Sequence, residues 1–249
     1  MEWRDDAILL SARPHGENAA IIEVLTPDHG RHAGVVRGGT SRKMTPHLQP
    51  GAQLTVEWRA RLEEHIGAFR VEPVRSRAAA LMGDRAALAT LTAICALVQN
   101  AVPEREPIPD LYRYTEALLD RMAEPGWAAD YVRWEMFLLE ELGYGLDLSE
   151  CAATGATGDL CYVSPRTGRA VSRAGAGTWA DKLLPLPSFL RENVAPTDAD
   201  IADGLRLTGF FLRGWLAPAL SKPRLAEPRD AAAAAITRQL GAVSGSAGG

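Results

Sequence analysis

AILLSARPHGENAAIIEVLTPDHGRHAGVVRGG, residues 7–39, holds three short apolar and β-branched runs separated by turn residues. The proline, glycine, asparagine and aspartate residues at 14–18, 27–30 and 38–39 are the types that turns require. Runs of this length and composition, bounded in this way, are typical of β-strands. The stretch therefore predicts three consecutive strands near the amino terminus.

Two further strand patterns follow a polar loop that contains two prolines at 40–51. Residues 52–60 (AQLTVEWRA) alternate between apolar and polar side chains, and residues 62–74 supply a fifth run. Five short strands in about 70 residues fit a small closed barrel, since closure removes exposed sheet edges. We predict an OB-type β-barrel over residues 1–78.

The periodicity changes from two to 3.6 after the last strand, with apolar residues recurring at three- and four-residue steps from Leu81 to Val98. Further helix patterns begin at 107–110, near Trp127 and at Thr197. The chain therefore has an α+β, multidomain pattern. After the barrel it comprises an all-α domain over 79–240, a glycine-rich insertion over 144–176 with a short hairpin at 162–172, a short alanine-rich helix beyond Pro228 and a disordered tail at 241–249.

The composition is that of a globular protein, with 47% apolar and 23% charged residues in 249. Three cysteines form an odd, sparse set that fits a reducing compartment rather than a disulfide scaffold. Acidic residues occupy the amino terminus where a signal peptide needs basic ones, and apolar runs are too short to span a bilayer. We expect a soluble, cytoplasmic protein with no membrane partner.

The formal net charge of −4 conceals an uneven distribution along the chain. Residues 31–77 contain nine lysines and arginines against four acidic residues, whereas 81–160 contain five against 14. Residues 161–249 are basic again, with 11 against seven. Two basic blocks thus flank an acidic one, which indicates either a polyanionic partner or simply solvated surface charge.

Enzyme motifs are absent from the sequence. It has no G-x-S-x-G nucleophile elbow, no phosphate-binding P-loop and no strand-linked G-x-G-x-x-G motif. His29 and His32 are close enough to share a metal or a phosphate, although turn histidines commonly have no such role. Glu135, with its neighbours Glu140 and Glu141, has the pattern of a solvated helix face. A metal-dependent nuclease is disfavoured because no acidic cluster accompanies the basic block, and we predict no catalysis and no cofactor.

The basic block of the barrel predicts contacts with nucleic acid, because OB barrels bind single strands through phosphate contacts and aromatic stacking. Trp58 and Phe69 are the aromatic residues available for stacking, although Trp58 could equally be a core residue. The predicted DNA-binding residues lie at strand ends and in one loop: Arg31, Arg37, Arg42, Lys43, Trp58, Arg59 and Arg61.

Cys151 and Cys161 lie in the insertion, as the cysteines of a zinc ribbon would. Nine residues separate them, and no histidine follows His65. A structural zinc usually needs two close ligand pairs. We therefore predict buried thiols and no metal site.

Several phrases resemble one known family. They are SARPHGENAAIIEVLTPDHGR (11–31), VVRGGTSRK (35–43), LQPG (48–51), RWEMFLLEELGYGLDLSEC (133–151) and YVSPRTGRAVS (162–172). Together they are similar to the bacterial recombination mediator family RecO, and the likeness extends from Glu2 to about Arg229.

This resemblance implies a DNA-repair accessory protein that is associated with the nucleoid and has no enzymatic turnover. Such a protein would bind single- and double-stranded DNA, anneal complementary strands, contact single-strand-binding protein and, with RecR, help load RecA. The loop at 40–43 and Arg37 match the basic barrel face of the family. Arg133 matches a helical region that receives the acidic tail of single-strand-binding protein, and is the expected partner of the tail carboxylate.

The same resemblance bears on the metal question, because some family members carry a four-cysteine zinc module after this helix. Cys151 matches the first ligand, whereas Thr154, Ser172 and Gly175 stand at the other three positions and Cys161 falls outside the pattern. The alternative to a DNA-binding mediator is a protein-only adaptor, in which the acidic helical region docks basic partners and the barrel makes no direct DNA contact.

Overall fold

The computed structural model describes residues 1–62 and 64–246. The chain forms two compact units, Met1–Pro125 and Gly126–Gly249. None of the described helices is both long enough and apolar enough to cross a membrane.

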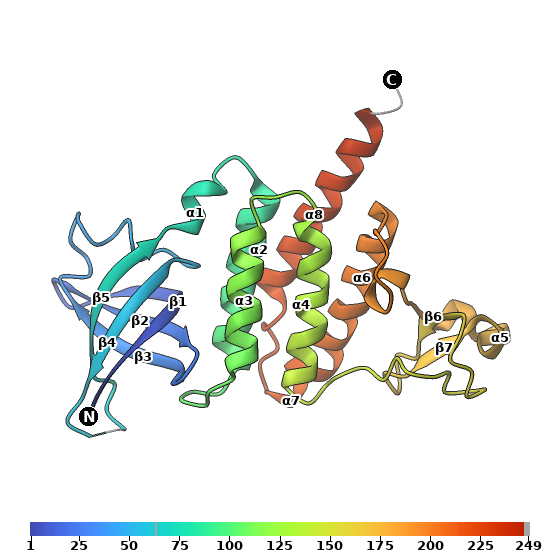
Figure 1. Cartoon of the computed structure of the whole chain (residues 1–249), viewed down its shortest axis with the longest axis horizontal. Helices are drawn as coiled ribbons and strands as arrows, with labels where there is room; N and C mark the ends of the chain where they lie inside the picture. The colour runs from blue at the N-terminus through green and yellow to red at the C-terminus, as the bar shows by residue number, and fades with distance from the viewer. Residues whose placement is uncertain (63, 247–249) are drawn as a thin grey trace. The chain divides into compact units, whose positions relative to one another are not determined.

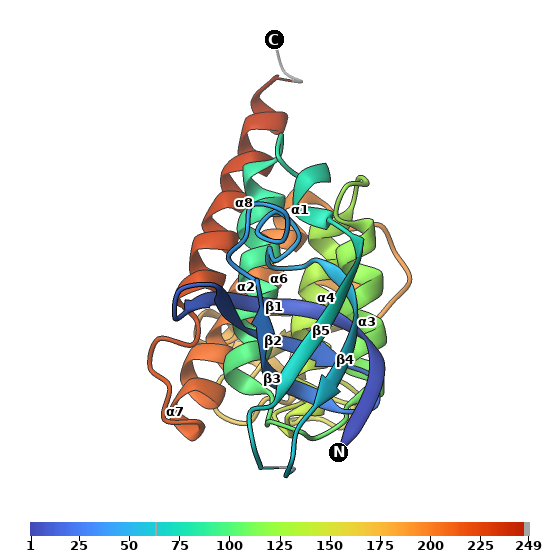
Figure 2. The same cartoon turned by 90° about the vertical axis from the view of Figure 1, so that its left-hand side faces the viewer.

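The first unit is built on a closed β-barrel, which confirms the predicted OB-type architecture (Figures 1 and 2). Neighbouring strands are antiparallel except β3 and β5, which are parallel. Closure follows the order β1-β2-β3-β5-β4. The strands are β1 (Glu2–His15), β2 (Ala19–Thr26), β3 (Gly30–Arg37), β4 (Gln53–Arg59) and β5 (Ala68–Arg75).

Strand alternation decides which side chains fill the barrel. On β4, Leu54, Val56 and Trp58 are buried in the interior, whereas the residues between them face outward. Phe69 of β5 packs against Gly34, where a Cβ atom would come within 2.4 Å of the ring. The barrel interior is therefore a packed apolar core.

Three helices complete the first unit: α1 (Arg77–Ala80), α2 (Arg85–Ala101) and α3 (Pro109–Arg121). Asp84 caps α2, because its carboxylate accepts hydrogen bonds of 2.9 Å from the backbone amides of Ala86 and Ala87. Tyr112 of α3 accepts a 2.8 Å hydrogen bond from Gln53 of the barrel, and the buried Arg77 donates to Gln53 at 2.8 Å and to Asp120 at 2.6 Å. Helices that the sequence pattern assigns to the all-α domain thus pack with the barrel.

The second unit contains the remaining long helices, α4 (Trp127–Glu141), α6 (Asp198–Phe211) and α8 (Glu227–Ser246). Thr197 and Asp200 form a reciprocal capping box at the start of α6, as the sequence pattern indicates. A π-helical turn, η3 (Leu212–Leu216), joins α6 to α7 (Ala217–Ala219).

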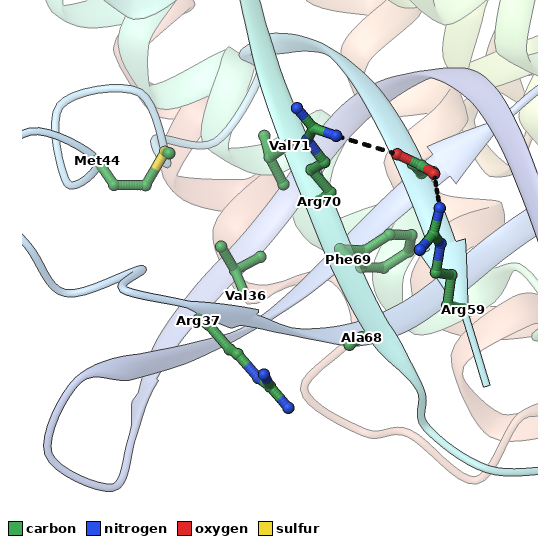
Figure 3. A pocket seen from close by; sticks show the side chains of 9 residues that line it. Val36, Arg37, Met44, Arg59, Ala68, Phe69, Arg70 and Val71 are labelled. Carbon is green, nitrogen blue, oxygen red and sulfur yellow. Dashed lines mark hydrogen bonds and ion pairs between the residues drawn. The ribbon is translucent and has the colours of Figure 1, made fainter. Parts of the chain in front are cut away.

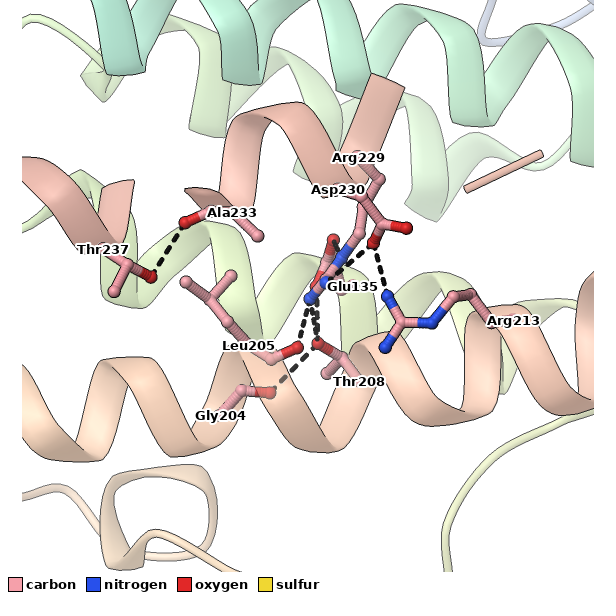
Figure 4. Close-up of polar contacts among 9 residues, drawn as sticks. All are labelled: Glu135, Gly204, Leu205, Thr208, Arg213, Arg229, Asp230, Ala233 and Thr237. Carbon is pink, nitrogen blue, oxygen red and sulfur yellow. Dashed lines mark hydrogen bonds and ion pairs between the residues drawn. The ribbon is translucent and has the colours of Figure 1, made fainter. Parts of the chain in front are cut away.

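A buried ion pair holds α4, α6 and α8 together (Figure 4). Arg229 of α8 donates to both carboxylate oxygens of Glu135 on α4, at 2.8 and 2.9 Å. Thr208 of α6 donates to the same carboxylate at 2.5 Å. Gly209 makes room, because a Cβ atom there would lie 2.4 Å from the guanidinium. The expectation that Glu135 faces solvent is therefore wrong, since its partners are contributed by helices distant in sequence.

The insertion forms a small sheet, which confirms the predicted hairpin. Strands β6 (Leu160–Val163) and β7 (Ala170–Ser172) are antiparallel, and β8 (Leu184–Pro185) pairs with β6. Short helical turns α5 (Arg173–Ala176) and η1 (Gly177–Lys182) follow β7, and η2 (Ser188–Leu190) follows β8.

The carboxyl-terminal helix is longer than the sequence pattern indicates. α8 continues to Ser246, so residues 241–246 are helical rather than part of a disordered tail. The rest of the predicted tail, 247–249, lies outside the described residues.

Candidate nucleic-acid interface

Three of the predicted DNA-binding cations lie at one end of the barrel. Arg37 ends β3, and Arg42 and Lys43 lie in the loop between β3 and β4, all exposed to solvent. Among the described residues, none of the three has an ion pair or a side-chain hydrogen bond. Their charges are therefore available to an anionic ligand.

Two other predicted cations, Arg59 and Arg61, lie on the outside of the barrel. Arg59 is 63% exposed and is paired with Glu2 at 2.7 Å and Glu57 at 2.6 Å. Arg61 is exposed in the loop that follows β4. A phosphate that bound Arg59 would compete with two carboxylates.

Arg31 does not belong to this surface, which corrects the sequence-based assignment. Its side chain is only 12% exposed, and it pairs with Glu23 at 2.8 Å and Glu104 at 3.3 Å. Its Nε also donates to the Val102 carbonyl at 2.8 Å. Arg31 is the second residue of β3 and Arg37 ends the strand, about 20 Å away for an extended chain. Arg31 therefore ties the barrel to the segment after α2.

Trp58 is a core residue rather than a stacking platform, so that prediction is wrong and its stated alternative is right. It is 1% exposed, and its indole N–H donates to the Ile66 carbonyl at 3.0 Å. His32 packs against its ring at 4.7 Å, and burial lowers the pKa of His32 below its ordinary value. No face of the indole is left for a base.

His29, in the turn before β3, and His32, within β3, are packing residues. His29 stacks on Trp3 with ring centroids 4.0 Å apart, and its Nδ1 lies 3.0 Å from the Asp5 carboxylate. The Nδ1 atom of His32 lies 3.1 Å from the carbonyl oxygen of the adjacent Ala33. The pair therefore does not form a shared metal or phosphate site.

A pocket of about 390 Å³ opens between β3, β5 and the β3–β4 loop (Figure 3). Its apolar lining includes Val36, Met44, Phe69 and Val71. The remaining lining residues are Arg37, Glu57, Arg59, Ala68 and Arg70, so that arginines from three strands surround an apolar floor.

Glu57 sets the charge of one wall of this pocket. Its carboxylate pairs with Arg59 at 2.6 Å and lies 3.9 Å from Arg70 (dashed lines in Figure 3). The hydrogen bond from Arg59 is the main cause that holds the pKa of Glu57 below its ordinary value. That wall is locally balanced in charge, whereas the Arg37 side has an uncompensated cation.

A second hollow of about 260 Å³ lies on the other side of the same loop. Arg13 of β1, Thr40, Thr45 and Gln49 are among its lining residues. The cationic loop is therefore flanked by two concave surfaces.

Arg13, Met44 and Arg70 are among the lining residues of these two hollows that the sequence-based set does not contain. A methionine alone in a polar loop, and an arginine between two apolar strand residues, were the signals that could have identified Met44 and Arg70.

Arg133, the predicted partner-binding residue, lies on α4 of the second unit. Its guanidinium pairs with Asp130 at 3.1 Å and sits 5.0 Å from the Phe189 ring. One third of the side chain, 34%, is exposed. It can reach a ligand carboxylate from solvent, in competition with Asp130.

The residues at the zinc-module positions do come together, but they do not fit a zinc ion. Cys151 accepts hydrogen bonds from the Ser172 amide at 3.2 Å and hydroxyl at 3.3 Å. A Cβ atom at Gly175 would lie 2.7 Å from the Cys151 sulfur. One thiolate, hydroxyls and a glycine are not the soft donor set that structural zinc needs.

Hydrogen bonds take the place of a metal around Cys151. Burial opposes ionisation of its thiol, but the Ser172 hydroxyl and amide, with Thr154, outweigh it and lower the pKa to about 6. Among the described residues, no cluster of three metal-ligating side chains occurs.

Comparison with known proteins agrees with this geometry. A model of the recombination protein O amino-terminal domain matches residues 1–77, and the corresponding carboxyl-terminal model matches residues 82–223. The chain belongs to the RecO family. The two RecO models thus meet where the barrel ends and the helices begin.

Curated RecO relatives cover nearly the whole chain. The chain is 57% identical to the DNA repair protein RecO of Ruegeria sp. over 96% of its length and all of that protein. It is 58% identical to the RecO of Roseobacter denitrificans with the same coverage. The Jannaschia sp. RecO is 55% identical over 96% of the chain and 98% of its own length. The chain is therefore a DNA repair protein of the RecO family.

Proposed function

We propose that the chain is a recombination mediator that binds single- and double-stranded DNA on the loop end of its barrel and anneals complementary strands. The observation that carries this proposal is the cluster of Arg37, Arg42 and Lys43, exposed and unpaired among the described residues. Cations that neutralise the phosphates of two strands on one surface reduce the repulsion that opposes annealing.

The family resemblance supports a set of proposed partners for this activity. Together with RecR, the protein would assist RecA in loading onto DNA covered by single-strand-binding protein. Nothing in this scheme requires turnover of a substrate or a bound cofactor, since binding and positioning suffice.

The double variant Arg42→Glu, Lys43→Glu tests the DNA-binding surface. At moderate salt we expect its affinity for a single-stranded oligonucleotide, measured by fluorescence anisotropy, to fall at least about tenfold, with a parallel loss of annealing rate. Arg113→Glu, at an exposed arginine on α3, is the control for a charge reversal outside the loop and should leave affinity within about twofold. An unchanged affinity in the double variant would place the DNA-binding surface elsewhere.

The protein-only adaptor is the competing function, and filter binding separates the two. A labelled oligonucleotide retained at low salt by the wild-type protein supports the mediator. No retention at any salt concentration would favour the adaptor, whose docking surface would be the acidic helical region.

A further inference from the structure

We infer that the pocket between β3, β5 and the β3–β4 loop receives one unstacked nucleobase of single-stranded DNA. This inference rests on the proposed function and deepens it, because it assigns the apolar floor to a base and the rim to phosphates. With such a pocket, the barrel would distinguish single-stranded from double-stranded DNA in addition to attracting phosphates.

The pocket arises from the way the barrel closes. The ladder between β3 and β5 contains two register pairs, Val35↔Ala68 and Val36↔Phe69. β3 ends one residue later at Arg37, whereas β5 continues to Arg75. The seam therefore opens beyond Phe69, and Met44 of the loop lines the opening (Figure 3).

The chemistry of the lining fits a base better than a bare phosphate. Met44 and Val71, which are partly exposed, offer apolar surface to the flat face of a base, and the buried Val36 and Phe69 lie beneath them. This contact is favoured because water is displaced from both surfaces. The Glu57 carboxylate in the wall is paired with Arg59, and its remaining lone pairs can accept a hydrogen bond from an amino or imino N–H of a base. At about 390 Å³ the pocket falls within the usual range for small-molecule sites.

The rim supplies the complementary charge for the flanking backbone. Arg37 is without an ion pair among the described residues, and Arg70 is 77% exposed with only a 3.9 Å contact to Glu57. Phosphates on the two sides of an inserted base would meet these guanidinium groups. In a duplex the bases are paired and stacked, so that entry would require extruding one at a cost of a few kcal/mol.

The test compares a thymine oligonucleotide with an abasic oligonucleotide of the same length and charge. The wild-type protein should bind the base-bearing strand at least about fivefold more tightly, the smallest gain expected from one stacked base. Val71→Glu should abolish this ratio. Val74→Glu, which adds the same charge to the same strand at a 61% exposed position outside the pocket, should preserve it.

A direct readout does not depend on any variant. Photocrosslinking of a 4-thiothymine oligonucleotide to the wild-type protein, followed by peptide mass spectrometry, should label Met44 or the segment 68–71. If circular dichroism shows that the Val71→Glu variant is unfolded, the abasic comparison and the crosslink in the wild-type protein decide whether the pocket binds a base.

The outcomes separate this inference from the proposed function. Equal affinity for base-bearing and abasic strands, or crosslinks confined to other segments, overturns the base pocket and leaves DNA binding intact. Absence of binding to both strands overturns the proposed function as well. Competition by thymidine monophosphate as effective as that of the oligonucleotide would indicate a free-nucleotide site and also overturn the inference.

Discussion

Arg133 illustrates how much a single residue depends on its neighbours. Its guanidinium is held over Phe189 and beside Asp130, so its charge is oriented but already partly compensated. Phe189 itself is only 2% exposed. A peptide that docks here would therefore interact mainly with the cation and gain little from the aromatic ring.

We propose that Arg133 binds the terminal carboxylate of the single-strand-binding protein tail. Arg133→Ala should weaken binding of an acidic tail peptide, measured by fluorescence polarisation, about tenfold, because one charge-assisted hydrogen bond is lost. Asp130→Asn removes the competing carboxylate and should bind at least as tightly as the wild type. Equal affinities of Arg133→Ala and the wild type would place the tail site elsewhere.

At the scale of elements, the second unit depends on how α8 docks. Arg229 and Glu135 are almost wholly buried, at 2% and 0% exposure, and Thr208 of α6 completes the network (Figure 4). The attraction of Glu135 outweighs the burial of Arg229 and raises the pKa of the guanidinium further. The attraction between the two charges offsets the free-energy cost of removing each from water.

Removing one partner of this pair should therefore cost more than removing both. Arg229→Met leaves Glu135 buried and unpaired, and should lower the free energy of unfolding by about 3–5 kcal/mol in urea denaturation. The double variant Arg229→Met, Glu135→Met should recover most of that loss. A single variant within about 1 kcal/mol of the wild type would show that the carboxylate finds water or takes a proton instead.

At the scale of the whole molecule, the charge blocks of the sequence are partly cancelled in space. Within the first unit, Arg31 pairs with Glu23 and Glu104. Arg75 and Arg77 both pair with Asp120, which lies in the acidic block. The basic barrel segment is therefore less basic as a surface than as a sequence.

The salt dependence of DNA binding measures how many of these cations remain available. If Arg37, Arg42 and Lys43 make the phosphate contacts, the slope of log K against log salt for a single strand should be about −2. If all nine lysines and arginines of residues 31–77 contacted phosphates, the slope would be about −6. Anisotropy titrations between low and physiological salt distinguish the two, and the steeper slope would mean that the ion pairs open on binding.

Local features of the sequence were sufficient to predict the barrel strands, the hairpin of the insertion and the starts of the helices. Strand alternation around Trp58, the turn residues at 27–30 and the capping box at Thr197 act over a few residues, so the sequence contains all the partners involved. The length of α8 was missed because alanine and glycine near its end carry little apolar periodicity.

The sequence by itself determined the fold class, the family and the loop that presents Arg42 and Lys43. Only the tertiary structure decided that Trp58 is buried in the core, that Arg31 is held in ion pairs with Glu23 and Glu104, and that Glu135 is buried. It also decided that Val36, Phe69 and Val71 share a pocket with Met44. The physical reason is that burial and ion pairing depend on residues far apart in the chain, which strand and helix periodicity cannot bring together.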